Sequence, residues 1–77
     1  MEQKILNVGV ISCSGMAQSH MLAVQAHEQA RLVAICDVDE EKLREAGEKL
    51  GVDARYTDYR DLLRHPELDA VIIVTPD

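Results

Sequence analysis

The segment best suited to chemistry is a turn of small residues that follows the first apolar stretch of the chain. Residues 8–17 read Val-Gly-Val-Ile-Ser-Cys-Ser-Gly-Met-Ala. Between a strand and a helix, such a turn lets backbone N–H groups and the positive end of the helix receive a pyrophosphate. The fingerprint of that kind of site is Gly-x-Gly-x-x-Gly/Ala. Its three positions are taken here by Ser12, Ser14 and Ala17, so only the last one matches.

The two serines change what this turn can do. The first fingerprint position requires a tight turn, and we expect Ser12 to cost about 1 kcal/mol or more in backbone strain. The second position normally lacks a side chain so that phosphates can approach, but the hydroxyl of Ser14 could donate to a phosphate oxygen instead. Gly15 relaxes the turn. An ordinary strand-to-helix turn without a ligand is the alternative interpretation.

One acidic residue strengthens the nucleotide interpretation. In dinucleotide-binding folds, an acid about 20 residues past the turn accepts hydrogen bonds from the adenosine ribose. Asp37 stands at this distance from Ala17 and directly follows the apolar segment Arg31–Cys36. Its carboxylate would repel a 2′-phosphate, which favours NAD over NADP as the cofactor. In the alternative interpretation Asp37 only begins a turn, a position where aspartate is common.

The elements that would position these residues alternate between strands and helices. Strands are predicted where apolar residues run together, and helices where apolar residues recur every three or four positions. The predicted strands are Ile5–Ile11, Arg31–Cys36, Val52–Tyr56 and Ala70–Val74; the predicted helices are Gly15–Glu28, a second with Asp39 as its N-cap that ends before Gly51, and a third that Thr57 or Asp58 caps and that runs through Arg64. This β-α-β-α-β-α-β order indicates an α/β fold with a Rossmann-like parallel sheet in the strand order 3-2-1-4.

Composition narrows the classes of function. The chain has 77 residues, one domain at most, and a formal net charge of −6. This acidity, without a Lys/Arg cluster, argues against nucleic-acid partners. No apolar run reaches the length of about 18 residues that a membrane span requires, and the first residues lack the apolar stretch of a signal peptide. We therefore expect a cytoplasmic protein in which Cys13 and Cys36 are reduced thiols rather than part of a metal site.

Four blocks of the sequence resemble one family of enzymes, the glucose–fructose oxidoreductase/inositol dehydrogenase/MocA family. The blocks are residues 8–20, 32–39, 56–59 and 68–76, and they follow one another with the family's usual spacing. Together they span nearly the whole chain. The resemblance implies a NAD(P)-dependent oxidoreductase that acts on sugars, polyols or similar alcohols.

The resemblance also implies roles for particular residues. Eight of them match the family's pyrophosphate turn, its ribose-binding acid and the segment beside the nicotinamide: Ser12, Ser14, Gly15, Met16, Ala17, Asp37, Thr75 and Pro76. The family's catalytic lysine and its substrate-binding residues lie beyond the part that matches this chain. We therefore expect residues 1–77 to be the N-terminal part of a dinucleotide-binding domain, a truncated half-Rossmann unit without catalytic residues or a substrate domain.

Other interpretations stay open on the sequence alone. Segment Ala70–Val74 has no charged residue and would form an edge strand, so we expect the chain to self-associate through it. A non-catalytic half-Rossmann module that self-associates or binds adenine nucleotides weakly would have the same sequence features. A Rossmann domain for S-adenosylmethionine would also place an acid at the end of its second strand.

Overall fold

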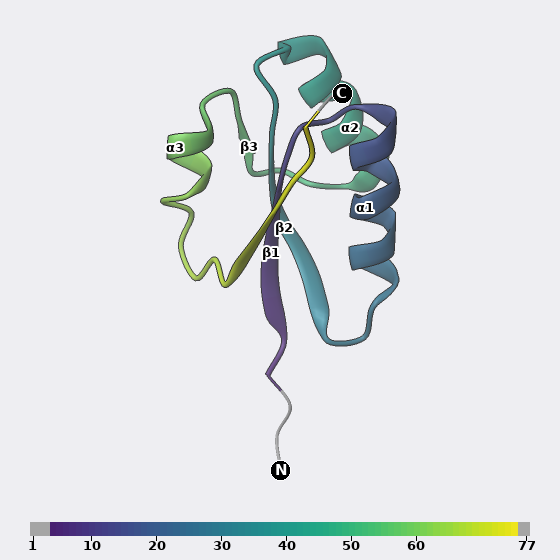
Figure 1. Ribbon diagram of the computed structural model, residues 1–77, viewed down its shortest axis with the longest axis vertical. Coiled ribbons are helices and arrows are strands. Elements are labelled where there is room, and N and C mark those ends of the chain that lie inside the picture. The colour runs from purple at the N-terminus through teal and green to yellow at the C-terminus, as the bar shows by residue number, and fades with distance from the viewer. Residues whose placement is uncertain (1–3, 76–77) are drawn as a thin grey trace.

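Four strands and three helices alternate along residues 4–75, the part of the chain that the computed structural model describes (Figure 1). The strands pair side by side in the order β3-β2-β1-β4, and every pairing is parallel. The predicted α/β class, parallel sheet and strand order 3-2-1-4 are therefore confirmed. The elements are β1 (Leu6–Ile11), α1 (Gly15–Ala26), β2 (Ala30–Cys36), α2 (Glu40–Leu50), β3 (Arg55–Tyr56), α3 (Tyr59–Leu62) and β4 (Ala70–Ile73).

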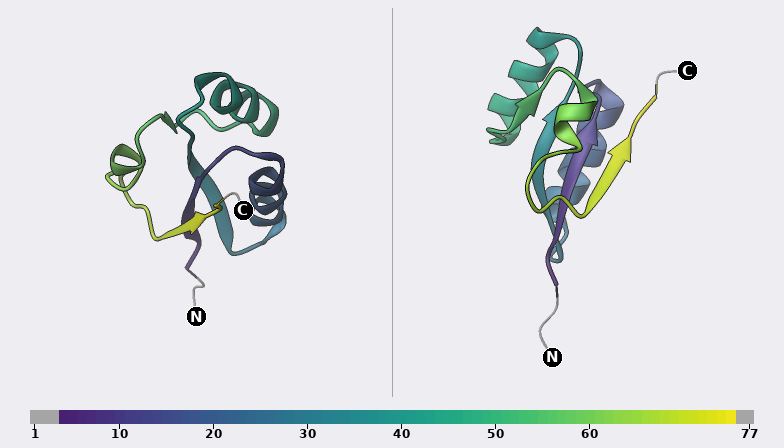
Figure 2. Two further views of the ribbon diagram at one scale, coloured as in Figure 1. Left: turned by 45° about the horizontal axis from the view of Figure 1, so that its top comes forward. Right: turned by 90° about the vertical axis from the view of Figure 1, so that its left-hand side faces the viewer.

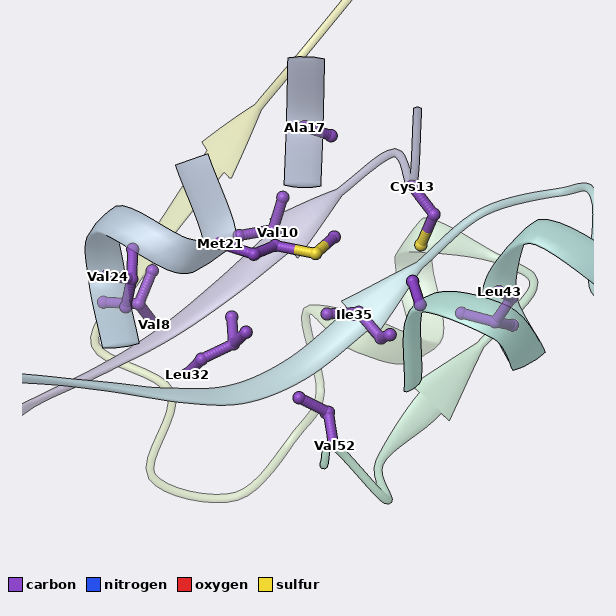
Figure 3. Packing of buried hydrophobic residues seen from close by; sticks show 11 residues of the cluster. Val8, Val10, Cys13, Ala17, Met21, Val24, Leu32, Ile35, Leu43 and Val52 are labelled. Carbon is purple, nitrogen blue, oxygen red and sulfur yellow. The ribbon is translucent and has the colours of Figure 1, made fainter. Parts of the chain in front are cut away.

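The larger core lies between the sheet and the helices α1 and α2, which share one face of it (Figure 1). Figure 3 shows Met21 and Val24 of α1 close to Val10 of β1 and Leu32 of β2. Met21 and Val10 are fully buried. Each aliphatic side chain buried in this way contributes about 1.5–3 kcal/mol, so the core is stabilised without any Phe or Trp in the sequence.

The opposite face of the sheet is covered by α3 and by the segment that leads from α3 to β4 (Figure 2). Leu62 of α3 is fully buried there. A Cβ at Gly9 would stand 3.0 Å from Leu62 Cδ2 and 3.1 Å from Leu68 Cδ1, so glycine is what allows both leucines to pack on β1. Toward the end of β4 this cover is missing, and Ile73 is 66% exposed.

Helix α2 begins and ends where the sequence predicts. The Asp39 side chain accepts hydrogen bonds from the amides of Glu41 and Lys42 at 3.0 and 3.1 Å. Such an N-cap satisfies amides that have no partner inside the helix. At the other end Gly51 takes a left-handed conformation with φ 70°, which glycine adopts at little cost. The chain therefore turns sharply from α2 toward β3.

The predicted ends of three elements were wrong by two or three residues. Helix α1 stops early because His27 is extended and its amide donates to the Val24 carbonyl. Val52 is apolar because it packs into the core, where it is 3% exposed, and not because it pairs in the sheet. The observed limits are Ala26 instead of Glu28 for α1, Arg55 instead of Val52 for β3, and Leu62 instead of Arg64 for α3.

Candidate functional site

The carboxyl ends of the strands border a cavity of about 760 Å³. In open α/β sheets, ligands bind in the crevice outside these strand ends, and cofactor sites have volumes of about 300–1,000 Å³. Every strand contributes to the lining through the residues at or just after its end. They are Ile11, Ser12 and Ser14 for β1, Cys36, Asp37 and Val38 for β2, Thr57 and Asp58 for β3, and Val74 for β4; Lys42 of α2 and Tyr59 of α3 complete the lining.

Ser12 is strained, as its place in the fingerprint predicts. Its φ is 105°, in the region that favours glycine and that other residues adopt only at a cost. Its amide donates to the Cys36 carbonyl at 2.7 Å, which fixes the start of the turn to the end of β2. Its Oγ accepts a hydrogen bond from the Ser14 amide at 3.3 Å. The turn therefore bends tightly although it lacks the usual glycine.

Ser14 is the N-cap of α1. Its Oγ accepts hydrogen bonds from the Ala17 amide and from the Ser12 hydroxyl, both at 3.3 Å. Because Ser14 uses its oxygen as an acceptor in these contacts, its hydroxyl proton stays available to a group in the cavity. Within residues 4–75, no acceptor bonds the amides of Gly15 and Met16. These two donors and the positive end of the helix dipole are therefore free to bind an acceptor from outside the described residues.

The carboxylate of Asp37 lies against this turn. Its Oδ2 accepts a hydrogen bond from the Cys13 amide at 2.8 Å, and its Oδ1 accepts one from the Asp39 amide at 2.9 Å. The two segments that the sequence singles out, the turn after β1 and the acid after β2, therefore meet at one point of the sheet edge. Each carboxylate oxygen accepts one of these bonds and has a second lone pair that neither bond uses.

The other predicted residues lie less close to the cavity. Gly15 and Met16 are exposed at the start of α1, and Met16 is 64% exposed. Ala17 is fully buried beneath them. Thr75 is exposed after β4 and does not line the cavity. Pro76 lies outside the described residues.

Sequence reasoning missed eight of the eleven lining residues, which are Ile11, Cys36, Val38, Lys42, Thr57, Asp58, Tyr59 and Val74. Val38 and Tyr59 present exposed apolar surface at the cavity, with 86% and 54% of each residue accessible, and Lys42 comes from the first turns of α2. A signal was present, because residues just after neighbouring parallel strands gather at one edge of a sheet. To name the lining residues from this signal, one must also know the strand order and the direction in which each side chain points.

The two cysteines belong to different cores. Cys13 packs with the core under α1 and α2, whereas Cys36 packs with the core under α3. Burial raises the pKa of the Cys13 thiol to about 12 and also raises the pKa of Cys36, and the nearby Asp37 carboxylate adds to both shifts. Both side chains therefore stay protonated at neutral pH, and Cys13 Sγ donates to the Cys36 carbonyl at 3.7 Å.

Residues 4–75 contain neither a cluster of metal-ligating side chains nor a helix that could span a membrane. No three His, Cys, Asp or Glu side chains gather closely enough to hold a metal ion. None of the described helices has both the length and the apolar character needed to cross a membrane.

A parallel sheet in the order β3-β2-β1-β4 with a cavity at its carboxyl edge defines a Rossmann-type nucleotide-binding fold. The model of an oxidoreductase family with an NAD-binding Rossmann fold matches residues 6–77. The chain therefore belongs to the glucose–fructose oxidoreductase/inositol dehydrogenase/MocA family, and the resemblance found in the sequence is confirmed.

Several characterised proteins are similar to this chain. Myo-inositol 2-dehydrogenase of Thermotoga maritima is 38% identical over 68 residues, which cover 88% of this chain and 20% of the relative. D-apiose dehydrogenase of Paraburkholderia graminis is 36% identical over 66 residues, or 86% of this chain and 18% of the relative. The crystal structure of myo-inositol dehydrogenase from Lactobacillus casei with NAD(H) and myo-inositol has a TM-score of 0.84 and 32% identity, over 92% of this chain and 22% of that one. The chain spans about one fifth of the length of these relatives.

Proposed function

We propose that this chain is the NAD-binding segment of an oxidoreductase that transfers hydride between a nicotinamide cofactor and a sugar, polyol or similar alcohol. The observation that carries the proposal is the cavity lined by Ser12, Ser14 and Asp37, where the turn before α1 meets the carboxylate after β2. Membership of the family supports the cofactor. Relatives named as inositol and apiose dehydrogenases support the substrate class.

The start of α1 would hold the pyrophosphate. The amides of Gly15 and Met16 lack an acceptor within residues 4–75, and the Ser14 hydroxyl can donate a third hydrogen bond. A helix dipole with free amides is a favourable site for phosphate oxygens. Ser12 would shape the turn, and the small side chain of Ala17 keeps α1 close to the sheet beneath the phosphates.

The end of β2 would hold the adenosine half of the cofactor. Asp37 can accept hydrogen bonds from the ribose hydroxyls through the lone pairs that its two backbone contacts leave unused. A carboxylate here repels a 2′-phosphate, which favours NAD over NADP. Val38 and Tyr59 offer apolar surface to the adenine, and Thr75 and Pro76 would border the nicotinamide half.

Binding and catalysis would reside in different parts of a longer protein. We assign residues 1–77 to the N-terminal part of the dinucleotide-binding domain and place the catalytic residues and the substrate domain elsewhere, so this chain alone would bind cofactor without turning over substrate. A non-catalytic module that binds adenine nucleotides weakly is the second candidate, and it is favoured by the Ser12 and Ser14 hydroxyls in the turn. The buried free thiols of Cys13 and Cys36 fit a cytosolic location.

Calorimetric titration tests this proposal. NAD⁺, NADP⁺ and ADP are titrated into the 77-residue chain and into the variants Asp37→Ala and Asp53→Ala, the second being an exposed acid that controls for net charge. We expect NAD⁺ to bind more tightly than NADP⁺, and we expect Asp37→Ala but not Asp53→Ala to weaken NAD⁺ binding. If no nucleotide binds the unmodified chain at millimolar concentration, the proposed function is wrong.

We also propose that two copies of this chain associate through β4. Within residues 4–75, β4 pairs with β1 on one side and has no partner on the other. Ile73 is 66% exposed, and such an uncharged apolar edge favours pairing with another strand. Sedimentation should show a dimer that Ile73→Lys dissociates and that Leu22→Lys, on the outer side of α1, leaves intact. A monomer at high concentration would refute this assignment.

A further inference from the structure

The Asp37 side chain is fixed between two segments that are far apart in the sequence. One carboxylate oxygen accepts the Cys13 amide of the turn at 2.8 Å, and the other accepts the Asp39 amide, just before α2, at 2.9 Å. The Asp37 amide itself donates to the Tyr56 carbonyl of β3 at 3.1 Å. The carboxylate therefore cannot rotate toward a ligand or toward solvent without giving up a charge-assisted hydrogen bond.

The turn that Asp37 contacts needs such support. Ser12 precedes Cys13 in a conformation that a serine adopts only when its surroundings hold it there. Three hydrogen bonds tie the turn to the end of β2. The Ser12 amide and Cys13 Sγ donate to the Cys36 carbonyl at 2.7 and 3.7 Å, and the Cys13 amide donates to Asp37. Of these three, only the bond to Asp37 uses a charged group. Without it the Cys13 amide would lose its acceptor while the Cys13 side chain stayed buried.

We infer that Asp37 is a positioning residue for the pyrophosphate turn as well as an acceptor for the ribose. The inference rests on the proposed function and extends it: one carboxylate holds the turn that aims the Gly15 and Met16 amides, and the same carboxylate receives the sugar. The two halves of the adenosine diphosphate site are therefore coupled through a single side chain. Removing the Asp37 carboxylate should therefore weaken the binding even of a ligand whose sugar has no hydroxyl group to donate to it.

Electrostatics alone predicts the opposite sign, which makes the inference testable. Asp37 is an acid beside a site for phosphates, and removing its charge should strengthen the binding of an anion if charge repulsion were its only effect. A positioning role predicts weaker binding instead. The dideoxy analogue of ADP is the suitable probe, because its sugar has no hydroxyl group to donate to the carboxylate.

The variants Asp37→Asn and Asp37→Ala separate the hydrogen bond from the charge, since both remove the charge and only asparagine keeps an acceptor. By calorimetry we expect Asp37→Ala to bind the dideoxy analogue about tenfold more weakly than the unmodified chain, the loss of roughly one hydrogen bond to a charged group. Asp37→Asn should stay within about threefold. Equal or tighter binding of the analogue by Asp37→Ala would overturn the inference.

Amide hydrogen exchange tests the same contact without a ligand. In Asp37→Ala the Cys13 amide should exchange faster, while the Ala17 amide, capped by Ser14, keeps its protection and so reports that α1 is intact. Unchanged protection of the Cys13 amide would refute the positioning role. If that amide is released but the unmodified chain binds no nucleotide, the proposed function fails and the positioning of the turn by Asp37 stands.

Discussion

The strained turn at Ser12 provides the most direct test of the structure. A φ of 105° places the serine Cβ in a region that costs about 1–3 kcal/mol for a residue other than glycine. Glycine has no Cβ and takes this conformation freely. We therefore expect the substitution Ser12→Gly to stabilise the protein, although most substitutions by glycine destabilise.

The expected size follows from three opposing contributions. Relief of strain contributes about 1–3 kcal/mol. The greater freedom of glycine in the unfolded chain costs about 0.4–1 kcal/mol. Loss of the two long hydrogen bonds between Ser12 Oγ and Ser14, both 3.3 Å, costs about 0.5 kcal/mol together because both are weak and part-exposed. At the middle of these ranges the net gain is about 0.8 kcal/mol, which for a domain of this size raises the Tm by about 3–6 °C.

Thermal unfolding followed by circular dichroism at neutral pH measures this gain. The matched control is Ser19→Gly in the middle of α1, where the serine makes only a weak 3.4 Å hydrogen bond to the Gly15 carbonyl. There glycine should lower the free energy of unfolding by about 0.5 kcal/mol, because it is a poorer helix former than serine. If Ser12→Gly lowers the Tm as Ser19→Gly does, the turn is not strained and the reasoning is wrong.

Three further substitutions test the packing and the buried thiol. Leu62→Ala should lower the free energy of unfolding by about 2–5 kcal/mol in urea titrations, whereas Leu63→Ala, at a residue that is 51% exposed, should change it by less than about 0.5 kcal/mol. A Cβ at Gly47 would collide with the Arg55 side chain, so Gly47→Ala should gain about 1 kcal/mol in thermal stability in an Arg55→Ala background and clearly less in the unmodified chain. Burial raises the Cys13 pKa from 9.0 to about 12, so the native state keeps a proton that the unfolded chain releases. Stability should therefore fall as the pH rises from 9.0 toward about 12, and Cys13→Ala should flatten this decline in alkaline denaturation curves.

Much of the fold could be predicted because local signals agree with one another. In α2, the apolar spacing, the Asp39 cap and Gly51 all indicate the same limits, and the structure has them. At Val52 the local signals are ambiguous. An apolar residue before a short strand gives the same sequence pattern whether it pairs in the sheet or, as here, fills the core. Short elements such as β3 take their ends from tertiary contacts, which single-residue patterns do not contain.

Those residues of the candidate site that are related by a spacing in the sequence could be predicted, whereas those brought together only by tertiary packing could not. The distance between the turn and the acid led to Ser12, Ser14 and Asp37, and all three line the cavity. Lys42 and Tyr59 line it through the directions in which α2 and α3 project from the sheet, and those directions depend on packing. The bond between Asp37 and the Cys13 amide joins two loops whose approach depends on how β1 and β2 register.

The central place of β1 has a consequence for how the chain is made. It is synthesised before the other described strands, yet one of its two edges is completed only by β4, the last of them. Asp69 fastens that closure by accepting the Asn7 amide at 2.8 Å while it pairs with Lys4 at 3.1 Å. A nascent chain can build β1, α1 and β2 early, but one edge of β1, in the middle of the sheet, stays unpaired until β4 has emerged from the ribosome.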